Sequence, residues 1–128
     1  MNDLALVFLG GGLGAACRWL VVRASARLLG PSFPWGTLAV NLAGCFLIGL
    51  SLGLAERGIG GRRLKPLAVA GFLGGLTTFS SYAYETVDLL RRGACGRALA
   101  NVALDNFGGL AFATLGLAAG LRLGIGAR

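Results

Sequence analysis

The sequence has no histidine, three cysteines and only five acidic residues among its 128 positions. Cys17, Cys45 and Cys95 are widely spaced and form no CxxC pair, so we expect them to be small apolar residues and not metal ligands or disulfide partners. No nucleophile stands beside a base, and no two carboxylates form a pair. These absences predict a protein that is not an enzyme.

Charge is also scarce. Only 13% of the residues are charged, whereas the surface of a soluble domain is usually about 25–35% charged. Hydrophobic residues make up 55% of the chain, and the mean hydropathy is +0.75. The 23 glycines alternate with Leu, Ala, Val and Phe, which excludes a disordered or collagen-like chain. The composition predicts an integral membrane protein, and the length predicts one domain over residues 1–128.

Four apolar segments are long enough to span a membrane, because about 20 helical residues cross a hydrocarbon core of about 30 Å. The connections between them are short and rich in Gly, Pro and Arg, which leaves no room for a soluble domain. We therefore predict an all-α fold with four transmembrane helices. The segments are residues 4–22, 35–55, 67–84 and 98–121.

The 12 basic residues divide evenly between the two sides of such a four-span protein. Orientation follows an excess of Lys and Arg on one side, and here there is none. We therefore predict dual topology, in which copies insert both ways up and pair as an antiparallel dimer. The basic residues lie between apolar segments, which favours contact with lipid headgroups over nucleic acid. One side has Arg57, Arg62, Arg63, Lys65, Arg122 and Arg128, and the other has Arg18, Arg23, Arg27, Arg91, Arg92 and Arg97.

Glycines four residues apart recur in all four segments, and such spacing lets helix backbones approach closely in lipid. The spacing predicts a packed bundle without indicating which helices pair. The positions are Gly10 and Gly14, Gly49 and Gly53, Gly71 and Gly75, and Gly116, Gly120 and Gly124.

Polar residues gather in the middle of the third segment, in the run GGLTTFSSY at residues 74–82. Two glycines followed by Thr-Thr and Ser-Ser form a poor helix interior. We expect Gly74 and Gly75 to break the helix, so that the carbonyls of Gly74 and Thr77 can hold a cation. The alternative is an unbroken helix whose hydroxyls bond to carbonyls four residues earlier.

Two further features of the spans bear on function. Asn41 is the only strongly polar side chain of the second segment, and its amide could either donate to an anion or bond a neighbouring helix. Phe79 and Tyr82 are three residues apart on one helix face. Their ring edges carry the positive end of the aromatic quadrupole, so they could face an anion or simply pack together.

Three runs of the sequence closely resemble the CrcB/Fluc fluoride channels: GGLGAACR at 11–18, GTLAVNLAG at 36–44 and GFLGGLTTFS at 71–80. The resemblance covers nearly the whole chain. It implies a fluoride-selective channel of the bacterial inner membrane that exports fluoride passively, as an antiparallel homodimer or as a heterodimer with a paralogue. It also implies a structural, untransported Na+ at the dimer centre, held by the backbone carbonyls of Gly74 and Thr77.

The resemblance also implies a set of residues along the fluoride pathway. Asn41 matches the pore asparagine of the family, and Phe79 matches the first of two pore phenylalanines. The full set is Asn41, Phe79, Tyr82, Thr78, Ser80 and Glu85.

Three positions depart from the family pattern. Tyr82 stands where the second phenylalanine is usual, Gly109 where a serine is usual, and Asp105 where a neutral polar residue is usual. A carboxylate 4 Å from an anion raises a barrier of about 4 kcal/mol at an effective dielectric constant of about 20. Asp105 is therefore expected to slow permeation unless it is protonated, paired with an Arg or turned away.

Two other functions fit the same architecture. A small dual-topology multidrug or cation transporter would need a membrane-embedded Glu in its first helix, and the first segment has none. The carboxylates within the spans are instead Glu85 and Asp105, late in the chain. A subunit that assembles without transporting is the other alternative.

Overall fold

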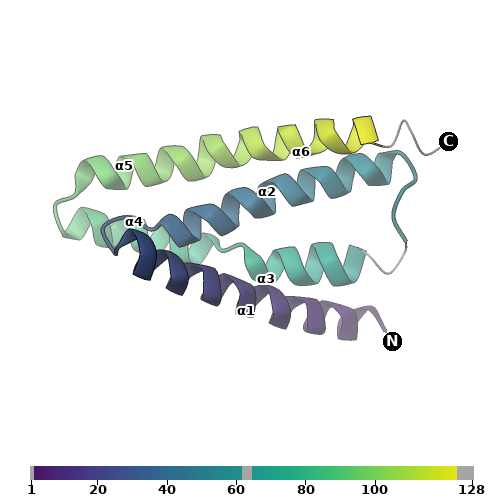
Figure 1. The fold of residues 1–128 in the computed structure, drawn as a ribbon, viewed down its shortest axis with the longest axis horizontal. Helices are drawn as coiled ribbons and strands as arrows, with labels where there is room; N and C mark the ends of the chain where they lie inside the picture. The colour runs from purple at the N-terminus through teal and green to yellow at the C-terminus, as the bar shows by residue number, and fades with distance from the viewer. Residues whose placement is uncertain (1, 62–64, 124–128) are drawn as a thin grey trace.

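The chain passes back and forth four times as helices, in the computed structural model that describes residues 2–61 and 65–123 (Figure 1). No strand occurs within those two ranges. The first pass is α1 (Asp3–Leu29) and the second is α2 (Trp35–Glu56). The third contains π-helical η1 (Lys65–Leu73), α3 (Gly74–Leu76) and α4 (Phe79–Arg91), and the fourth contains α5 (Cys95–Ala103), π-helical η2 (Leu104–Gly108) and α6 (Gly109–Leu123).

The four helical passes confirm the prediction of four helical segments. Three helices are long and apolar enough to cross a membrane, namely Asp3–Leu29, Trp35–Glu56 and the continuous run Cys95–Leu123. The third pass is not among them because it is interrupted in its middle. The first pass is longer than predicted, since α1 continues to Leu29, whereas the apolar segment was expected to end at residue 22.

The connections between the passes lie at the two ends of the bundle. The N-terminus, the C-terminal end and the connection between α2 and η1 lie at one end, and the other two turns lie at the opposite end (Figure 1). Gly30 and Gly93 occupy the two opposite turns with φ of 80° and 73°, a left-handed conformation that favours glycine. The passes therefore alternate in direction, as four membrane spans require.

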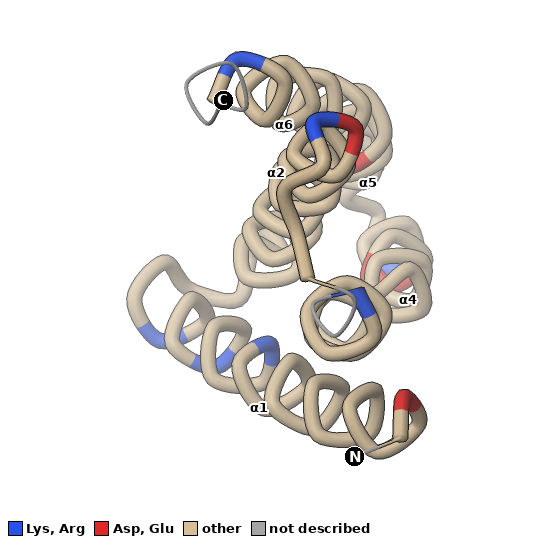
Figure 2. Tube along the Cα trace, turned by 90° about the vertical axis from the view of Figure 1, so that its right-hand side faces the viewer, with Lys and Arg blue, Asp and Glu red and all other residues tan. Residues whose placement is uncertain are grey.

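The charged residues lie mostly near the ends of the passes, while Arg18, Arg23 and Arg27 follow along the second half of α1 (Figure 2). Arg62, Arg63 and Arg128, which contribute to the even division of basic residues, lie outside the described residues. Dual topology stays a prediction.

The spaced glycines bring the passes into two close pairs. Side chains at Gly49 and Gly53 on α2 would overlap backbone carbonyls of α6, and side chains at Gly116 and Gly120 on α6 would overlap backbone carbonyls of α2. The second pair joins α1, through Gly10 and Gly14, to η1 and α3, through Gly71 and Gly75. The prediction that these glycines pack helices is confirmed for the described positions, and Gly124 lies outside them.

Substitution of Gly14 should separate α1 from η1. A Cβ at Gly14 would overlap the carbonyl oxygen of Phe72, so Gly14→Ala forces the backbones apart. We expect a loss of about 1–3 kcal/mol, the usual cost of overpacking, measured as a lower unfolding temperature in detergent. Gly12→Ala is the matched control, because a Cβ at Gly12 meets nothing within 4 Å. Equal losses from the two substitutions would contradict this account.

Large apolar side chains remain exposed over the outside of the single chain, including Phe8 at 80% and Leu28 at 83%. The buried apolar core is small and consists of Val40, Leu73 and Leu76, with Phe72 packed against it. A helical chain that is apolar outside and closely packed through glycine has the surface of a membrane protein.

Candidate functional site

The third pass is broken at Thr77 and Thr78. Both residues have extended backbones, with φ and ψ of −81° and 155° at Thr77 and of −154° and 114° at Thr78. The prediction of a broken helix is confirmed, and the alternative of an unbroken helix is wrong. The expected place of the break is also wrong, because Gly74 and Gly75 lie inside α3.

Packing explains why the glycines do not form the break. A Cβ at Gly75 would overlap the carbonyl oxygen of Gly11, so Gly75 serves the close approach of α1. On the other side, a Cβ at Gly44 of α2 would overlap the methyl group of Thr77. The Thr77 hydroxyl donates back to the Leu73 carbonyl at 2.9 Å, which is the local bond expected for an unbroken helix, here at the last turn before the break.

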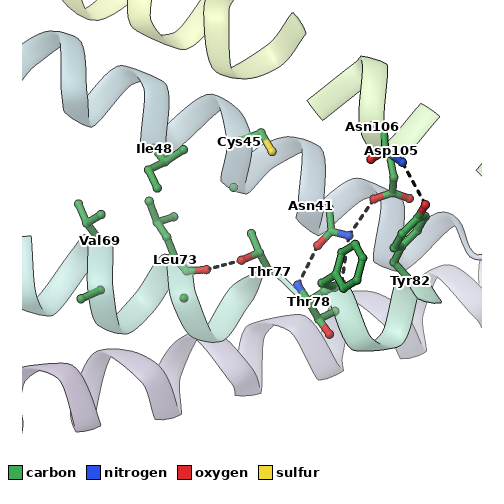
Figure 3. A pocket seen from close by; sticks show the side chains of 14 residues that line it. Asn41, Cys45, Ile48, Val69, Leu73, Thr77, Thr78, Tyr82, Asp105 and Asn106 are labelled. Carbon is green, nitrogen blue, oxygen red and sulfur yellow. Dashed lines mark hydrogen bonds between the residues drawn. The ribbon is translucent and has the colours of Figure 1, made fainter. Parts of the chain in front are cut away.

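The side chain of Asn41 bridges the break from α2. Its Oδ1 accepts the backbone N–H of Thr78 at 2.9 Å, and its Nδ2 donates to the Thr78 carbonyl at 3.3 Å. Nδ2 also donates to Oδ1 of Asp105 at 2.8 Å. The amide thus takes the place of a peptide group beside Thr78, so in this structure Asn41 bonds neighbouring helices, one of the two roles considered for it (Figure 3).

The carbonyls of Gly74 and Thr77 are among those that lose their helical partners at the break. The N–H that would bond the Gly74 carbonyl belongs to Thr78, and it donates to Asn41 instead. The N–H that would bond the Thr77 carbonyl belongs to Ser81, and it donates to Oγ1 of Thr78 at 3.1 Å. Side chains have therefore captured both amides. The two freed carbonyls belong to the residues proposed from the sequence as cation ligands.

Thr78 also begins the second half of the third pass. It is the N-cap residue of α4, and the bond from Ser81 satisfies one of the amides that a helix start leaves unpaired. Its hydroxyl lies 3.2 Å from Oγ of Ser80 and 3.1 Å from Oγ of Ser81. Three hydroxyls therefore gather at one helix start, with Ser80 exposed.

An open cavity of about 530 Å³ lies against the break. Its lining includes four of the six predicted pathway residues and both residues predicted to hold a cation, while Ser80 lies beside Thr78 without lining the cavity. The lining residues on which the argument depends are Asn41, Gly74, Thr77, Thr78, Phe79 and Tyr82, together with Asp105 and Asn106 (Figure 3).

Phe79 and Tyr82 form an aromatic pair at the cavity, as their spacing predicts. Their ring centroids are 5.3 Å apart, and the rings are tilted by 52°. Phe79 is 77% exposed, whereas Tyr82 is buried. The Tyr82 hydroxyl, which is absent from the family's usual phenylalanine, accepts a hydrogen bond from Nδ2 of Asn106 at 3.0 Å.

Asp105 reaches the same cavity from η2. Its Oδ1 accepts from Asn41, while its Oδ2 is buried and has no hydrogen-bond partner among the described residues. Gly109 lies one turn further on, where a side chain would stand 3.3 Å from Sγ of Cys45. The carboxylate is therefore hydrogen-bonded to Asn41, has no Arg partner among the described residues, and is not turned away from the cavity.

Glu85 lies apart from this cavity. It lines a second cavity of about 340 Å³ near the turns at one end of the bundle, together with Thr37, Asp88 and Arg97. The hydroxyl of Thr37 donates to Oε1 of Glu85 at 2.8 Å. The structure therefore places five of the six predicted pathway residues around the break and one in the second cavity.

Three polar residues with side-chain hydrogen bonds were not predicted as site residues: Thr37 and Asn106, which line the cavities, and Asn101, which lines neither. Thr37 and Asn101 are each 1% exposed, and Asn101 donates to Oγ1 of Thr86 at 2.9 Å. A spacing signal was available, because Thr37 precedes Asn41 by four residues and Asn101 precedes Asp105 by four, which places each pair on one helix face. Asn106 gave no such signal.

These features define a class of protein: a small helical membrane protein with polar side chains gathered at a broken helix. Residues 5–117 match the family model described as CrcB-like protein, Camphor Resistance (CrcB). The chain belongs to this family.

The chain is also similar to curated proteins named fluoride-specific ion channel FluC. The protein from Bordetella petrii is 50% identical over 119 residues, which cover 92% of this chain and 90% of that protein. The protein from a Chelativorans species is 44% identical over 118 residues, covering 91% and 94%. The protein from Agrobacterium fabrum is 50% identical over 97 residues, covering 75% and 78%. These relatives are ion channels, which agrees with the prediction that the chain is not an enzyme.

Proposed function

We propose that this protein is a fluoride-selective channel that lets fluoride leave the cell passively. The observation that carries the proposal is the cavity at the break, where Asn41, Thr78 and the Phe79–Tyr82 pair meet. Fluoride is small and strongly hydrated, so a pathway must replace its water with donors. Hydroxyls and the positive ring edges supply several weak contacts, which let an ion enter and also leave. The names and the coverage of the relatives support the same function.

The pathway that we propose contains Asn41, Phe79, Tyr82, Thr78, Ser80 and Glu85. Asn41 and Thr78 lie together at the break, and Ser80 adds an exposed hydroxyl beside them. Glu85 belongs to the second cavity, nearer the end of the bundle. An ion that contacts the residues at the break and also Glu85 therefore passes from the first cavity to the second along α4.

A structural Na+ completes the proposal. Unwound backbone carbonyls are typical sodium ligands at membrane depth. The carbonyls of Gly74 and Thr77 fit this role, because side chains have captured the two N–H groups that would otherwise bond them. Gly74 is also exposed on the single chain. A sodium ion there would neutralise the dipoles of the broken helix and would not be transported.

The assembly that we propose is an antiparallel dimer in the bacterial inner membrane, of two identical copies or with a paralogue. The even division of basic residues and the exposed Gly74 support it. Exposed Cys95 lies at the end of the bundle opposite the chain termini, so a thiol reagent that cannot cross membranes tests it. Dual topology predicts labelling of Cys95 from both sides, in a variant that retains this cysteine alone.

A fluoride release assay tests the function. Liposomes loaded with potassium fluoride and containing the purified protein should release fluoride when valinomycin balances the charge with potassium. Liposomes without protein should retain it, and chloride-loaded liposomes with protein should retain chloride. Release no faster than from protein-free liposomes would overturn the proposal, and equal release of chloride would overturn the selectivity.

A further inference from the structure

The two N–H groups of Asn41 are both in use. One donates to the Thr78 carbonyl at 3.3 Å, and the other donates to Oδ1 of Asp105 at 2.8 Å. An amide has only two such donors. An anion that approaches Asn41 must therefore displace one of these bonds, and the shorter of the two is the bond to Asp105.

Asp105, the acceptor in the shorter bond, is the harder of the two partners for an anion to displace. A hydrogen bond to an ionised carboxylate is stronger than a bond to a neutral carbonyl. Oδ2 of Asp105 is buried without a hydrogen-bond partner among the described residues, so the ionised form of this group places unpaired negative charge beside the cavity. The carboxylate thus occupies the donor and also repels the ion that would use it.

We propose that Asp105 restricts anion passage through this chain by holding an N–H group of Asn41. This inference rests on the proposed fluoride pathway and assigns to Asp105 the control of its rate. It follows that removal of the carboxylate should increase fluoride release, which is the opposite of what loss of a structural residue produces.

Two substitutions test the inference in the fluoride release assay. Asp105→Asn keeps the shape of the side chain and removes its charge, and Asp105→Ser removes the group that accepts from Asn41. Each should increase the release rate about tenfold or more, which corresponds to a barrier lowered by about 1.4 kcal/mol. Asp105→Asn should also retain the unfolding temperature of the wild-type protein, because it replaces a buried carboxylate that has one unpaired oxygen with a neutral group of the same shape.

Asp3→Asn is the matched control. Asp3 is exposed in the first turn of α1 and lines neither cavity, so the same chemical change there should leave the rate unaltered. Variants of Asp105 that release fluoride at the wild-type rate or more slowly would overturn the inference and leave the proposed function standing. Release from the Asp105 variants but not from the wild-type protein would support both the inference and the proposed function. An absence of release from all of these proteins would overturn both.

Discussion

Replacement of Asn41 by leucine should abolish fluoride release and destabilise the fold. The side chain makes hydrogen bonds to both backbone groups of Thr78 and to Asp105. Leucine has similar size and none of these groups, so the buried N–H of Thr78 and the carboxylate of Asp105 would lose their partner. We expect a loss of about 3 kcal/mol in the free energy of unfolding. Release should fall to the rate of protein-free liposomes, because the break that shapes the cavity would lose its bridge.

Asn101→Leu separates the loss of stability from the loss of fluoride release. Asn101 is as fully buried as any side chain of the described bundle, and it bonds Thr86 without lining the cavity at the break. This substitution should also lower the unfolding temperature, yet fluoride release should continue in the protein that remains folded. If Asn41→Leu released fluoride at the wild-type rate, Asn41 would have no place in the pathway.

Removal of sodium should have the second large effect. Protein prepared throughout in N-methyl-D-glucamine in place of sodium should lose fluoride release by about tenfold or more, because the carbonyls of Gly74 and Thr77 would lack the cation that we propose they hold. The mass of the protein in detergent, measured by light scattering, should fall from that of a dimer to that of a monomer. Sodium added back should restore both.

Thr77→Val distinguishes the carbonyl from the hydroxyl as the sodium ligand. The Thr77 hydroxyl already donates to the Leu73 carbonyl, so the proposed ligand is the backbone oxygen, which valine retains. The sodium dependence of release should therefore be the same in this variant. Sodium-free protein that stays dimeric and releases fluoride normally would show that no structural cation is needed.

The break shows how far sequence reasoning reached at the site. Glycine and hydroxyl residues at 74–82 made a continuous helix unfavourable, so a break could be predicted. Its position could not, because Asn41 on another helix captures the N–H of Thr78. Gly75, which seemed suited to the break, is instead required for contact with Gly11. A contact between residues distant in sequence decided where the helix ends.

The arrangement of the pathway residues was also predictable only in part. The spacing of Phe79 and Tyr82 placed both rings on one helix face, and their contact in the structure agrees with it. The pairing of Asp105 with Asn41 joins positions 64 residues apart, and the separation of Glu85 into a second cavity depends on the approach of α2 through Thr37. Neither arrangement has a local signal.

The sequence by itself determined the four helical passes, the short turns and the use of glycine for close packing, because length, hydropathy and four-residue spacing are local properties. The tertiary structure alone decided which helices pair, where the third pass breaks and which carbonyls become free. The pairing depends on which glycines meet a facing backbone, and the break depends on which side chain bonds each backbone N–H; at Thr78 that side chain is Asn41.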